Sequence, residues 1–425
     1  VSIFTSSTAV LIQSVNVLIS GHNIDFILPF NSYYGTFRFE IDSLSAFFLL
    51  PILFISCIAT VYGFEYMKGN NSSKTWFFLG LLIASMIGVV TARNGLLFLL
   101  CWEIMSLTSF FLVSFEDSKK EVQKASLIYL VAAHIGATFL LVFFALFWVK
   151  SGSLDFINLK NLIPFPSSYI DIMFLAAFLG FGAKAGFIIL HVWLPEAHPA
   201  APSHVSAIMS GVMVKTGIYG ILRVLMLLGV VQEWWGWLLI ITGVISGIFG
   251  ILFTLVQRDI KKLLAYSTVE NIGIITIGLG LGILGMSYNK PMITLMGFGG
   301  SLLHILNHSL FKSMLFFCAG SVLHGTKTRD MEQLGGLFKS MPWTGTTFLI
   351  GSCAISGLPP LNGFISEFLI YQGAFYSLNS NSKFLTLLGI IIIVSLAIIG
   401  ALALLTFTRA FGITFLGALR NPKIE

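Results

Sequence analysis

Apolar runs of about 20 residues recur along the whole length of this 425-residue chain. A run of that length allows an α-helix to cross the hydrocarbon core of a membrane. Apolar residues make up 56% of the chain and charged residues only 10%, against about a quarter in soluble proteins. A transmembrane β-barrel would show short segments of alternating hydrophobicity instead. The sequence therefore predicts an all-α polytopic membrane protein with about 12 transmembrane helices.

The expected spans include two that must be irregular. Within the span 344–376, Pro359 and Pro360 remove backbone donors and are flanked by glycines, so we expect a helix break there. A second break is expected at Gly182, in the glycine-rich segment 180–186 around Lys184. That segment superficially resembles a dinucleotide-binding glycine loop, but no strand precedes it, and we reject that interpretation. Irregular backbone at membrane depth survives only inside protein or along a wet cavity. The expected spans are 4–20, 43–64, 75–92, 94–115, 123–149, 170–192, 203–228, 234–256, 269–286, 292–323, 344–376 and 384–417.

Loop charges predict the orientation. When the spans are counted alternately, most loop lysines and arginines fall on the side of the N-terminus, which favours that side as cytoplasmic. Segment 21–42 then lies outside, and its β-prone flanks predict a hairpin. The net charge of +6 is dispersed among short loops, so it does not indicate nucleic-acid binding. The chain begins at Val1 without Met, and the sequence leaves open a fragment, a processed chain or a partial chain.

Ionisable side chains inside apolar runs are the strongest functional signal. A charge near the centre of a spanning helix costs roughly 2.5–3.5 kcal/mol on insertion scales, and packing alone does not require one. Acids, lysines and histidines that alternate through one helical bundle can pass a proton from site to site. The predicted proton-transfer residues are Glu103, Lys184, Lys215, His304, His308, Lys312 and Glu367.

The first three of these residues lie in separate spans. Glu103 is close to the midpoint of its run, where it is either a proton site tuned by a neighbouring lysine or a structural carboxyl. Lys184 and Lys215 suit proton exchange, because a buried lysine changes its protonation state more readily than an arginine. The structural alternative for Lys215 is a fixed partner to an acid such as Glu103.

The remaining four residues lie in the last third of the chain. His304, His308 and Lys312 follow i, i+4, i+8 spacing and therefore share one stripe of one helix. Histidine changes its charge near neutral pH and can accept a proton on one nitrogen while donating from the other. Glu367 follows the break by four residues, so it is either an ion-pathway carboxylate or a helix cap.

Cofactor motifs are missing from the sequence. The four cysteines lie inside or at the edge of apolar runs without metal-ligand spacing, and we interpret them as core residues. We therefore expect no cofactor, no metal site and no catalytic residue in this chain.

Four segments together resemble a known family. They are His191–Ser203 (HVWLPEAHPAAPS), Ser210–Arg223 (SGVMVKTGIYGILR), His304–Lys312 (HILNHSLFK) and Gly357–Glu367 (GLPPLNGFISE). Together they are similar to the antiporter-like proton-pumping subunits of respiratory complex I, of multi-subunit sodium/proton antiporters and of membrane-bound hydrogenases. The form EAHPAAPS is most similar to the large membrane subunit of hydrogenase-4 and formate hydrogenlyase.

The resemblance implies a fold of two inverted five-helix repeats, each with a broken helix. It also implies a Glu103–Lys184 pair, a relay through Lys215, His304, His308 and Lys312, and Glu367 at the exit side. The expected division is 1–93 for N-terminal helices with the external hairpin, 94–256 and 257–417 for the two repeats, and 418–425 for a short tail. Expected partners are other subunits of a hydrogenase or complex I-like assembly in a prokaryotic cytoplasmic membrane.

Three functions compete on these observations. The first is a proton-translocating, non-redox subunit of an energy-converting complex, in which any redox chemistry belongs to other subunits. The second is the same fold exchanging sodium for protons, but sodium needs several oxygen ligands and the buried sites are mainly lysine and histidine. The third is a haem-binding cytochrome, which is disfavoured because His304 and His308 on one helix face cannot sandwich one haem.

Overall fold

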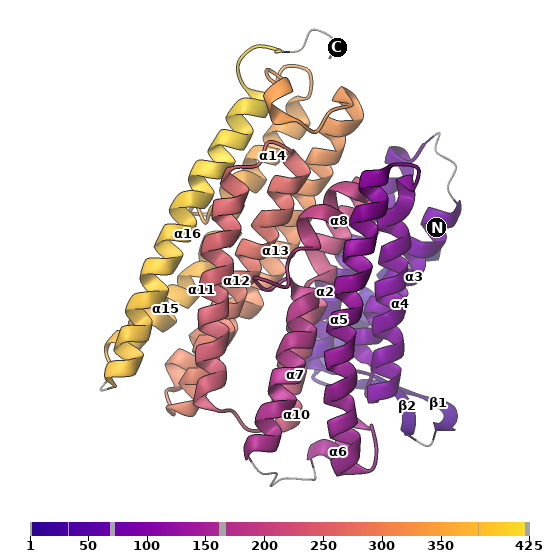
Figure 1. Ribbon diagram of the computed structural model, residues 1–425, viewed down its shortest axis with the longest axis vertical. Helices are drawn as coiled ribbons and strands as arrows, with labels where there is room; N and C mark the ends of the chain where they lie inside the picture. The colour runs from indigo at the N-terminus through magenta and orange to yellow at the C-terminus, as the bar shows by residue number, and fades with distance from the viewer. Residues whose placement is uncertain (1, 33, 69–72, 161–166, 381, 421–425) are drawn as a thin grey trace. The chain divides into compact units, whose positions relative to one another are not determined.

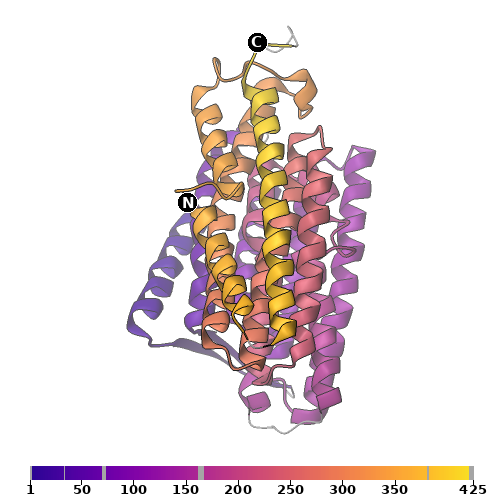
Figure 2. The same cartoon turned by 90° about the vertical axis from the view of Figure 1, so that its left-hand side faces the viewer.

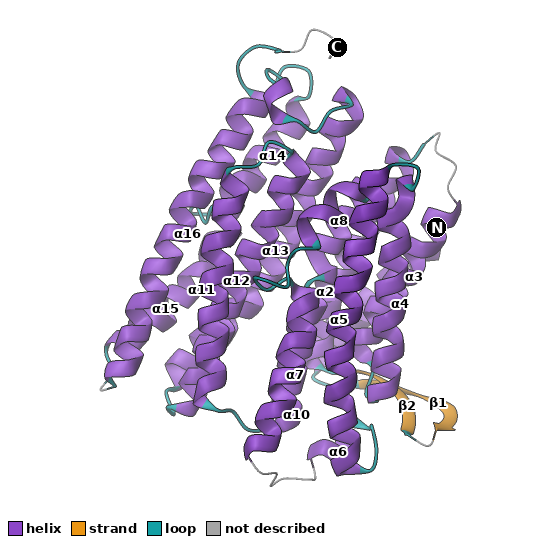
Figure 3. Ribbon diagram, in the orientation of Figure 1, coloured by secondary structure: helices purple, strands orange, loops and turns teal. Residues whose placement is uncertain are grey.

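The computed structural model describes residues 2–32, 34–68, 73–160, 167–380 and 382–420, and these are mostly helical (Figures 1 and 3). Within this part of the chain, eleven helices are long and apolar enough to cross a membrane. Two shorter helices, α14 (Pro342–Ile355) and α15 (Asn362–Leu378), occupy the interrupted span. The predicted all-α polytopic class with about 12 spanning segments is confirmed.

The chain forms two compact units, which we describe separately. Unit 1 comprises residues 1–186 and 200–230. Its helices pack in sequence order, α1 on α2, α3 on α4, and α5 on α7. Its elements are α1 (Ser2–Ser20), β1 (Ile24–Ser32), β2 (Gly35–Ile41), α2 (Ser43–Tyr66), α3 (Ser73–Thr91), α4 (Gly95–Val113), α5 (Lys120–Ser151), α6 (Phe156–Lys160), α7 (Ser167–Ala185), α9 (Ser203–Ile208), a π-helical turn (Met209–Met213) and α10 (Lys215–Leu228).

Unit 2 comprises residues 187–199 and 231–425. Helix α12 lies between α11 and α13, and α16 packs against α11, α14 and α15 (Figure 2). A core of Ile and Leu side chains from α11, α12, α15 and α16 fills the space between these helices. Its elements are α8 (Leu194–Ala200), α11 (Glu233–Leu255), α12 (Ile260–Ser287), α13 (Pro291–Thr326), α14, α15 and α16 (Lys383–Phe415).

The hairpin predicted at 21–42 is confirmed. Strands β1 and β2 pair antiparallel, with Ile24 opposite Ile41, and they are the only strands in the described ranges (Figure 3). Tyr33, at the predicted centre of this hairpin, lies outside the described residues. The carboxylate of Asp155 accepts hydrogen bonds from the backbone N–H of Thr36 and, at 2.7 Å, from the side chain of Asn94. Asn94 caps the N-terminus of α4, so this contact fixes the hairpin to the start of that helix.

Two boundaries differ from the sequence prediction. The span expected at 269–286 begins nine residues earlier, because Asp259 accepts hydrogen bonds from the N–H groups of Lys261 and Lys262 and caps α12. The predicted boundary at residue 256 does not coincide with the edge of a compact unit, because α11 packs on α12 in unit 2. The division into repeats remains a prediction. Of the expected tail 418–425, residues 421–425 lie outside the described part of the chain.

A cluster of charges in unit 1 connects the junction between β2 and α2 to the end of α3 and to α10. The carboxylate of Asp42 accepts two hydrogen bonds from Arg223, at 2.6 and 2.8 Å, and lies 3.0 Å from Arg93. It also accepts from the N–H of Ser45 and so caps α2. The Tyr219 hydroxyl accepts from Arg223 and donates to the carbonyl of Val90. We call Asp42, Arg93 and Arg223 the charge cluster.

The charge cluster sets the protonation of its acid. Burial by itself would raise the pKa of Asp42, but the hydrogen bond and charge of Arg223, followed by the charge of Arg93, outweigh burial. The pKa therefore lies well below its ordinary value of 3.8. Because Arg223 is nearly buried, removal of the carboxylate would leave it without its counter-ion, whereas Arg93 would keep Glu40 at 3.4 Å.

Asp42→Asn is therefore expected to destabilise the folded chain by about 3 kcal/mol, the order found when one partner of a buried ion pair is removed. The thermal unfolding of the purified chain in detergent measures this effect. Glu65→Gln is the matched control, because Glu65 pairs with Lys68 on an exposed surface, and we expect a change of about 0.5 kcal/mol or less. Equal melting temperatures for Asp42→Asn and wild type would contradict a stabilising role.

The lowered pKa of Asp42 predicts how the stability of the fold depends on pH. A carboxyl whose pKa is lowered on folding stabilises the fold above its unfolded pKa, and this contribution is lost as the pH falls through the folded value. The difference in melting temperature between wild type and Asp42→Asn should therefore stay constant from about pH 8 to about pH 5 and shrink below about pH 4. A difference that already disappears at neutral pH would contradict the ion-pair assignment.

Candidate functional site

Lys184 lies in the last turn of α7 and is buried within unit 1, with 4% of its surface exposed. Its ammonium donates hydrogen bonds to the hydroxyls of Ser106, at 2.9 Å, and Tyr129, at 3.1 Å. The rings of Trp102 and Tyr129 lie within 5.5 Å of the nitrogen. A cation in the last turn of a helix is also favoured by the helix dipole. Hydroxyls and aromatic rings thus hold a buried lysine, and the Tyr129 hydroxyl is itself hydrogen-bonded to Ser109.

Glu103 does not form the ion pair that the resemblance implied. Its carboxylate lies 3.8 Å from Nε2 of His134 on α5, and among the described residues no carboxylate lies within 4.0 Å of the Lys184 nitrogen. The Glu103 side chain is 36% exposed and that of His134 is 52% exposed. Glu103 and Ser106 are three residues apart on α4 and therefore lie on neighbouring positions of one helix face. The serine that binds Lys184 thus lies one turn from the acid.

Lys215 directly follows an irregular turn. Residues Met209–Met213 form a π-helical turn between α9 and α10, and such turns are frequent at functional sites. The Lys215 ammonium donates to the carbonyl oxygen of Ser210 at 2.5 Å, inside that turn, and the side chain is 2% exposed. The irregular backbone therefore supplies an acceptor to a buried lysine that a regular helix would have used internally.

The first helix break lies four residues beyond its predicted position. Gly182 is inside α7 and its carbonyl accepts from the N–H of Gly186. The helix ends at Ala185, and Gly186 has φ +82°, which a residue with a side chain rarely adopts. The predicted helix break at Gly182 is therefore wrong. At Gly180 an added Cβ would meet Leu140 at 2.5 Å, so close helix packing accounts for a glycine there.

In unit 2 the predicted stripe is confirmed as a single buried face of α13. The side chains of His304, His308 and Lys312 are fully buried. The two imidazole rings are nearly parallel, with centroids 6.4 Å apart. One nitrogen of His304 lies 2.9 Å from the Ser366 hydroxyl and the other 3.1 Å from the side-chain oxygen of Asn271.

Lys312 is the third member of this stripe. Its ammonium donates to the Ser267 hydroxyl on α12 at 2.5 Å. The amide of Asn271 donates to the carbonyl of Ser267 at 2.9 Å. Polar contacts therefore run from Ser366 through His304 and Asn271 to Ser267 and Lys312, connecting three helices of unit 2.

The second break is where Pro359 and Pro360 predicted it. Helix α14 ends at Ile355 and α15 begins at Asn362. Gly357 has φ +63°, and a Cβ on it would meet the carboxylate of Glu367 at 2.8 Å. Glu367, 9% exposed, therefore lies with its carboxylate against the interruption, next in sequence to Ser366. It is five residues beyond the start of α15, so it does not occupy the N-cap position.

Sequence reasoning missed several buried charges. Glu270 on α12 is fully buried beside the polar contacts of unit 2. The predicted span begins at residue 269 and therefore places Glu270 at a membrane edge. With Asp259 as the N-cap, the helix begins at Ile260 and Glu270 lies well inside it. Arg93, between two predicted spans, and Arg223, at the end of the segment Ser210–Arg223, carried no sequence signal that they share one aspartate. His134 is half-exposed on α5, and nothing in its apolar run indicated that it faces Glu103.

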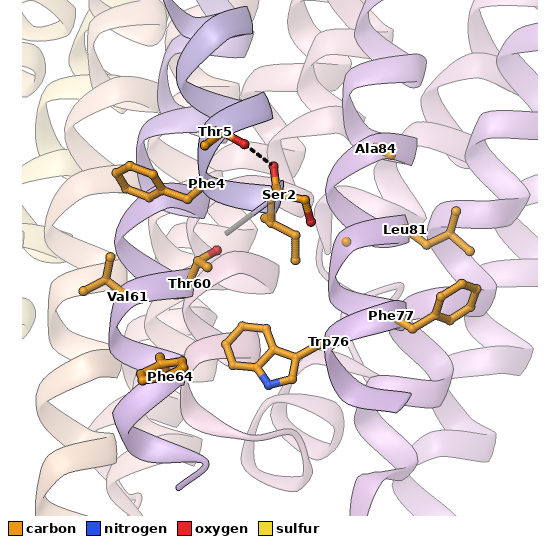
Figure 4. A pocket seen from close by; sticks show the side chains of 12 residues that line it. Ser2, Phe4, Thr5, Thr60, Val61, Phe64, Trp76, Phe77, Leu81 and Ala84 are labelled. Carbon is orange, nitrogen blue, oxygen red and sulfur yellow. Dashed lines mark hydrogen bonds between the residues drawn. The ribbon is translucent and has the colours of Figure 1, made fainter. Parts of the chain in front are cut away.

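One cavity in unit 1 has none of these residues in its lining. It has a volume of about 910 Å³ and is lined by side chains of α1, α2 and α3 in unit 1, among them Phe4, Phe64 and Trp76 (Figure 4). Its lining is mostly apolar and carries no ionisable side chain. We therefore do not assign the site to it. Within the described residues, no cluster of three His, Cys, Asp or Glu side chains could hold a metal ion.

Comparisons with known proteins agree with this architecture. Residues 92–395 match the model of the family described as NADH:quinone oxidoreductase/Mrp antiporter, TM. Residues 28–78 match the model described as NADH-ubiquinone oxidoreductase (complex I), chain 5 N-terminus. The first match covers α4 to α15 entirely, and therefore all seven predicted site residues.

Two curated relatives come from Escherichia coli (strain K12). The chain is 44% identical over 406 residues to hydrogenase-4 component B, an alignment that covers 94% of this chain and 60% of that protein. It is 38% identical over 386 residues to formate hydrogenlyase subunit 3, with 91% of this chain and 62% of that protein covered. The chain thus spans about three fifths of the length of these two relatives. A third relative, from a Na(+)/H(+) antiporter of Alkalihalophilus pseudofirmus, is 32% identical over 428 residues, with 97% of this chain and 52% of that protein covered.

A solved structure shows the same fold. The structure of the Mrp complex from Dietzia sp. DQ12-45-1b contains a chain that superimposes with a TM-score of 0.83 at 18% identity, covering 100% of this chain and 78% of that one. Long apolar helices and the family match over residues 92–395 identify an integral membrane protein. The chain belongs to the NADH:quinone oxidoreductase/Mrp antiporter family of membrane proteins.

Proposed function

We propose that the chain is a proton-translocating, non-redox membrane subunit of an energy-converting complex. The observation that carries the proposal is the polar path in unit 2 from Ser366 through His304 and Asn271 to Lys312. Its members are buried in helices that cross a membrane, where polar groups are expensive and commonly mark ion or proton pathways. Histidine and lysine can each bind and release a proton, which an aliphatic side chain of equal size cannot.

The chemistry of the site favours protons over sodium. Sodium is held by several oxygen ligands at once, whereas the ionisable groups along the unit 2 path are His304 and Lys312, with His308 between them on α13. A lysine ammonium repels a metal cation and carries the proton that is to be moved. Sodium/proton exchange by the same fold is the alternative, and the relative from a Na(+)/H(+) antiporter of Alkalihalophilus pseudofirmus keeps it open.

The two units contribute different elements to the proposal. In unit 1, Lys184 donates to two hydroxyl oxygens and Lys215 to a carbonyl oxygen, and these acceptors stay neutral when the lysine loses its proton. In unit 2, Glu367 lies against an interrupted helix, the kind of backbone that persists at membrane depth when it borders water or protein. We assign Glu367 to proton exchange with one face of the membrane and the lysines to transfer within the bundle.

Partners and location follow from the relatives. The names hydrogenase-4 component B and formate hydrogenlyase subunit 3 support an assembly of the hydrogenase or complex I-like type, in a prokaryotic cytoplasmic membrane. Redox cofactors would belong to other subunits, and this chain would bind none. The proposal therefore requires proton movement to be measured in the whole assembly, driven by its redox reaction.

Lys184→Met should uncouple proton movement from the redox reaction while the assembly persists. Methionine keeps the length of the side chain but removes the exchangeable proton, and a lost proton-transfer group commonly slows a step by about 100-fold. The measurement is acidification of inverted membrane vesicles per electron transferred. The control is Lys150→Met, at the exposed end of α5. Wild-type coupling in Lys184→Met would remove this lysine from the pathway.

Glu367→Gln should block coupled turnover with little loss of stability, because glutamine keeps the shape and most hydrogen bonding but carries no titrating proton. Glu367→Asp should retain part of the activity, since only the reach is shortened. Proton uptake and thermal stability are measured in one preparation, with Glu332→Gln in an exposed 3₁₀ turn as control. Full coupling in Glu367→Gln would reduce Glu367 to a structural residue. Vesicle uptake that depends on sodium concentration would favour sodium exchange.

A further inference from the structure

Glu270 is a fully buried acid to which no role has been assigned so far. It lies in the first half of α12, and 0% of its surface is exposed. Among the described residues neither of its carboxylate oxygens has a hydrogen-bond partner. A charged carboxylate in such a place is costly unless a cation compensates it. An ionised Glu270 therefore requires a cation nearby.

The cation whose charge acts on Glu270 is Lys312. The charges of Lys312 and Glu367 both act on the Glu270 carboxyl, and Lys312 is the one of opposite sign. The Lys312 ammonium donates to the Ser267 hydroxyl, which belongs to the turn of α12 before Glu270. Residues 267 and 270 share one helix face at i, i+3 spacing. The lysine therefore approaches α12 on the face that carries the acid.

Helix α11 packs closely against the backbone of α12 at Glu270. A Cβ on Gly250 would come within 2.6 Å of the Glu270 backbone nitrogen and 2.9 Å of its Cα. A Cβ on Gly247 would lie 3.9 Å from the Glu270 carbonyl oxygen. The two backbones are so close that no side chain fits between them, and α11 brings no charge to this point. The ionisable groups around Glu270 thus come from α13 and α15.

We propose that Glu270 is a proton-binding site that exchanges one proton with Lys312. This inference rests on the proposed function and adds a residue to it. In the step, the Lys312 ammonium first comes within hydrogen-bond distance of the Glu270 carboxylate; an N–H bond of the ammonium then breaks and an O–H bond forms on the carboxylate. The pair passes from two opposite charges to two neutral groups, so its net charge does not change. Transfer within the pair therefore moves a proton without placing a net charge in the membrane interior.

Glu367 gives this exchange a direction. Its carboxylate acts on Glu270 as a like charge, and like charges oppose each other. An ionised Glu367 therefore favours the proton on Glu270, and a protonated Glu367 favours its return to Lys312. Binding of a proton at the helix break is in this way linked to the position of a second proton in α12. The competing interpretation is that Glu270 is only a fixed counter-ion of Lys312.

A spectroscopic test detects the proton itself and does not depend on pumping. Infrared difference spectra of the full-length chain in lipid, recorded between two pH values, report protonated carboxyl groups by their C=O band. The band of Glu270 should be lost in Glu270→Gln, shifted in Glu270→Asp and altered in Lys312→Met. Thr276→Val is the control, because Thr276 is equally buried on α12 and its hydroxyl only donates to its own helix. Identical spectra for wild type and Glu270→Gln would overturn the proposal.

A transport test then asks whether this proton is used. Redox-driven proton uptake should fall by roughly 10-fold or more in Glu270→Gln, a modest value for the loss of a proton-transfer group, and should be partly restored in Glu270→Asp. If Glu270 were only a counter-ion, the double variant Glu270→Gln with Lys312→Met would recover the melting temperature lost in each single variant while uptake stayed normal in Glu270→Gln.

The outcomes separate this inference from the proposed function. If wild-type vesicles take up no protons but the carboxyl band is lost in Glu270→Gln, the proton site stands and the proposed function fails. If wild type pumps and Glu270→Gln matches it in uptake and spectrum, the proposed function stands and the inference fails. Because the double variant leaves no unpaired charge, it keeps the test valid if either single variant unfolds.

Discussion

Hydrocarbon does not solvate charge, and this constraint governs the arrangement of the whole chain. Each ionised group inside a spanning helix must find a counter-charge, a hydrogen-bond partner or water. The structure meets that demand with three kinds of partner. In the charge cluster, Asp42 pairs with both arginines, and Arg93 pairs with Glu40 as well. Hydroxyls and aromatic rings hold Lys184, and a backbone carbonyl holds Lys215.

These partners differ in what they allow. A bidentate pair between arginine and aspartate fixes both charges, because guanidinium keeps its proton in proteins. A lysine held by serine and tyrosine hydroxyls can release its proton without leaving an acid unpaired. The charge cluster is therefore suited to stability and the lysines to exchange. This contrast separates a structural from a functional role of buried charge more sharply than burial alone does.

Backbone irregularity supplies the remaining polar groups. The π-helical turn before Lys215 and the interruption between α14 and α15 both release backbone carbonyl or amide groups from regular helix bonding. At the second interruption, Gly357 leaves room for the Glu367 carboxylate, and Asn307 donates to the carbonyl of Asn362 at 2.7 Å. Each irregular segment thus lies against an ionisable side chain. Helix breaks and buried charges in this fold depend on each other, because each provides the polar partner that the other lacks.

The sequence by itself determined the class, most spans, the break at Pro359 and Pro360, and the buried stripe of His304, His308 and Lys312. These features follow from composition and local periodicity, which act over one helix or less. Only the tertiary structure decided the partners. It placed Glu103 near His134 instead of Lys184, moved the first break from Gly182 to Gly186, and buried Glu270 on the face of α12 that Lys312 approaches. Such pairings join helices far apart in the chain, and one sequence records no distance between them. The N-cap at Asp259 is a local signal that extends α12 and places Glu270 inside the helix. Where Lys312 lies relative to Glu270 follows only from the packing of the helices.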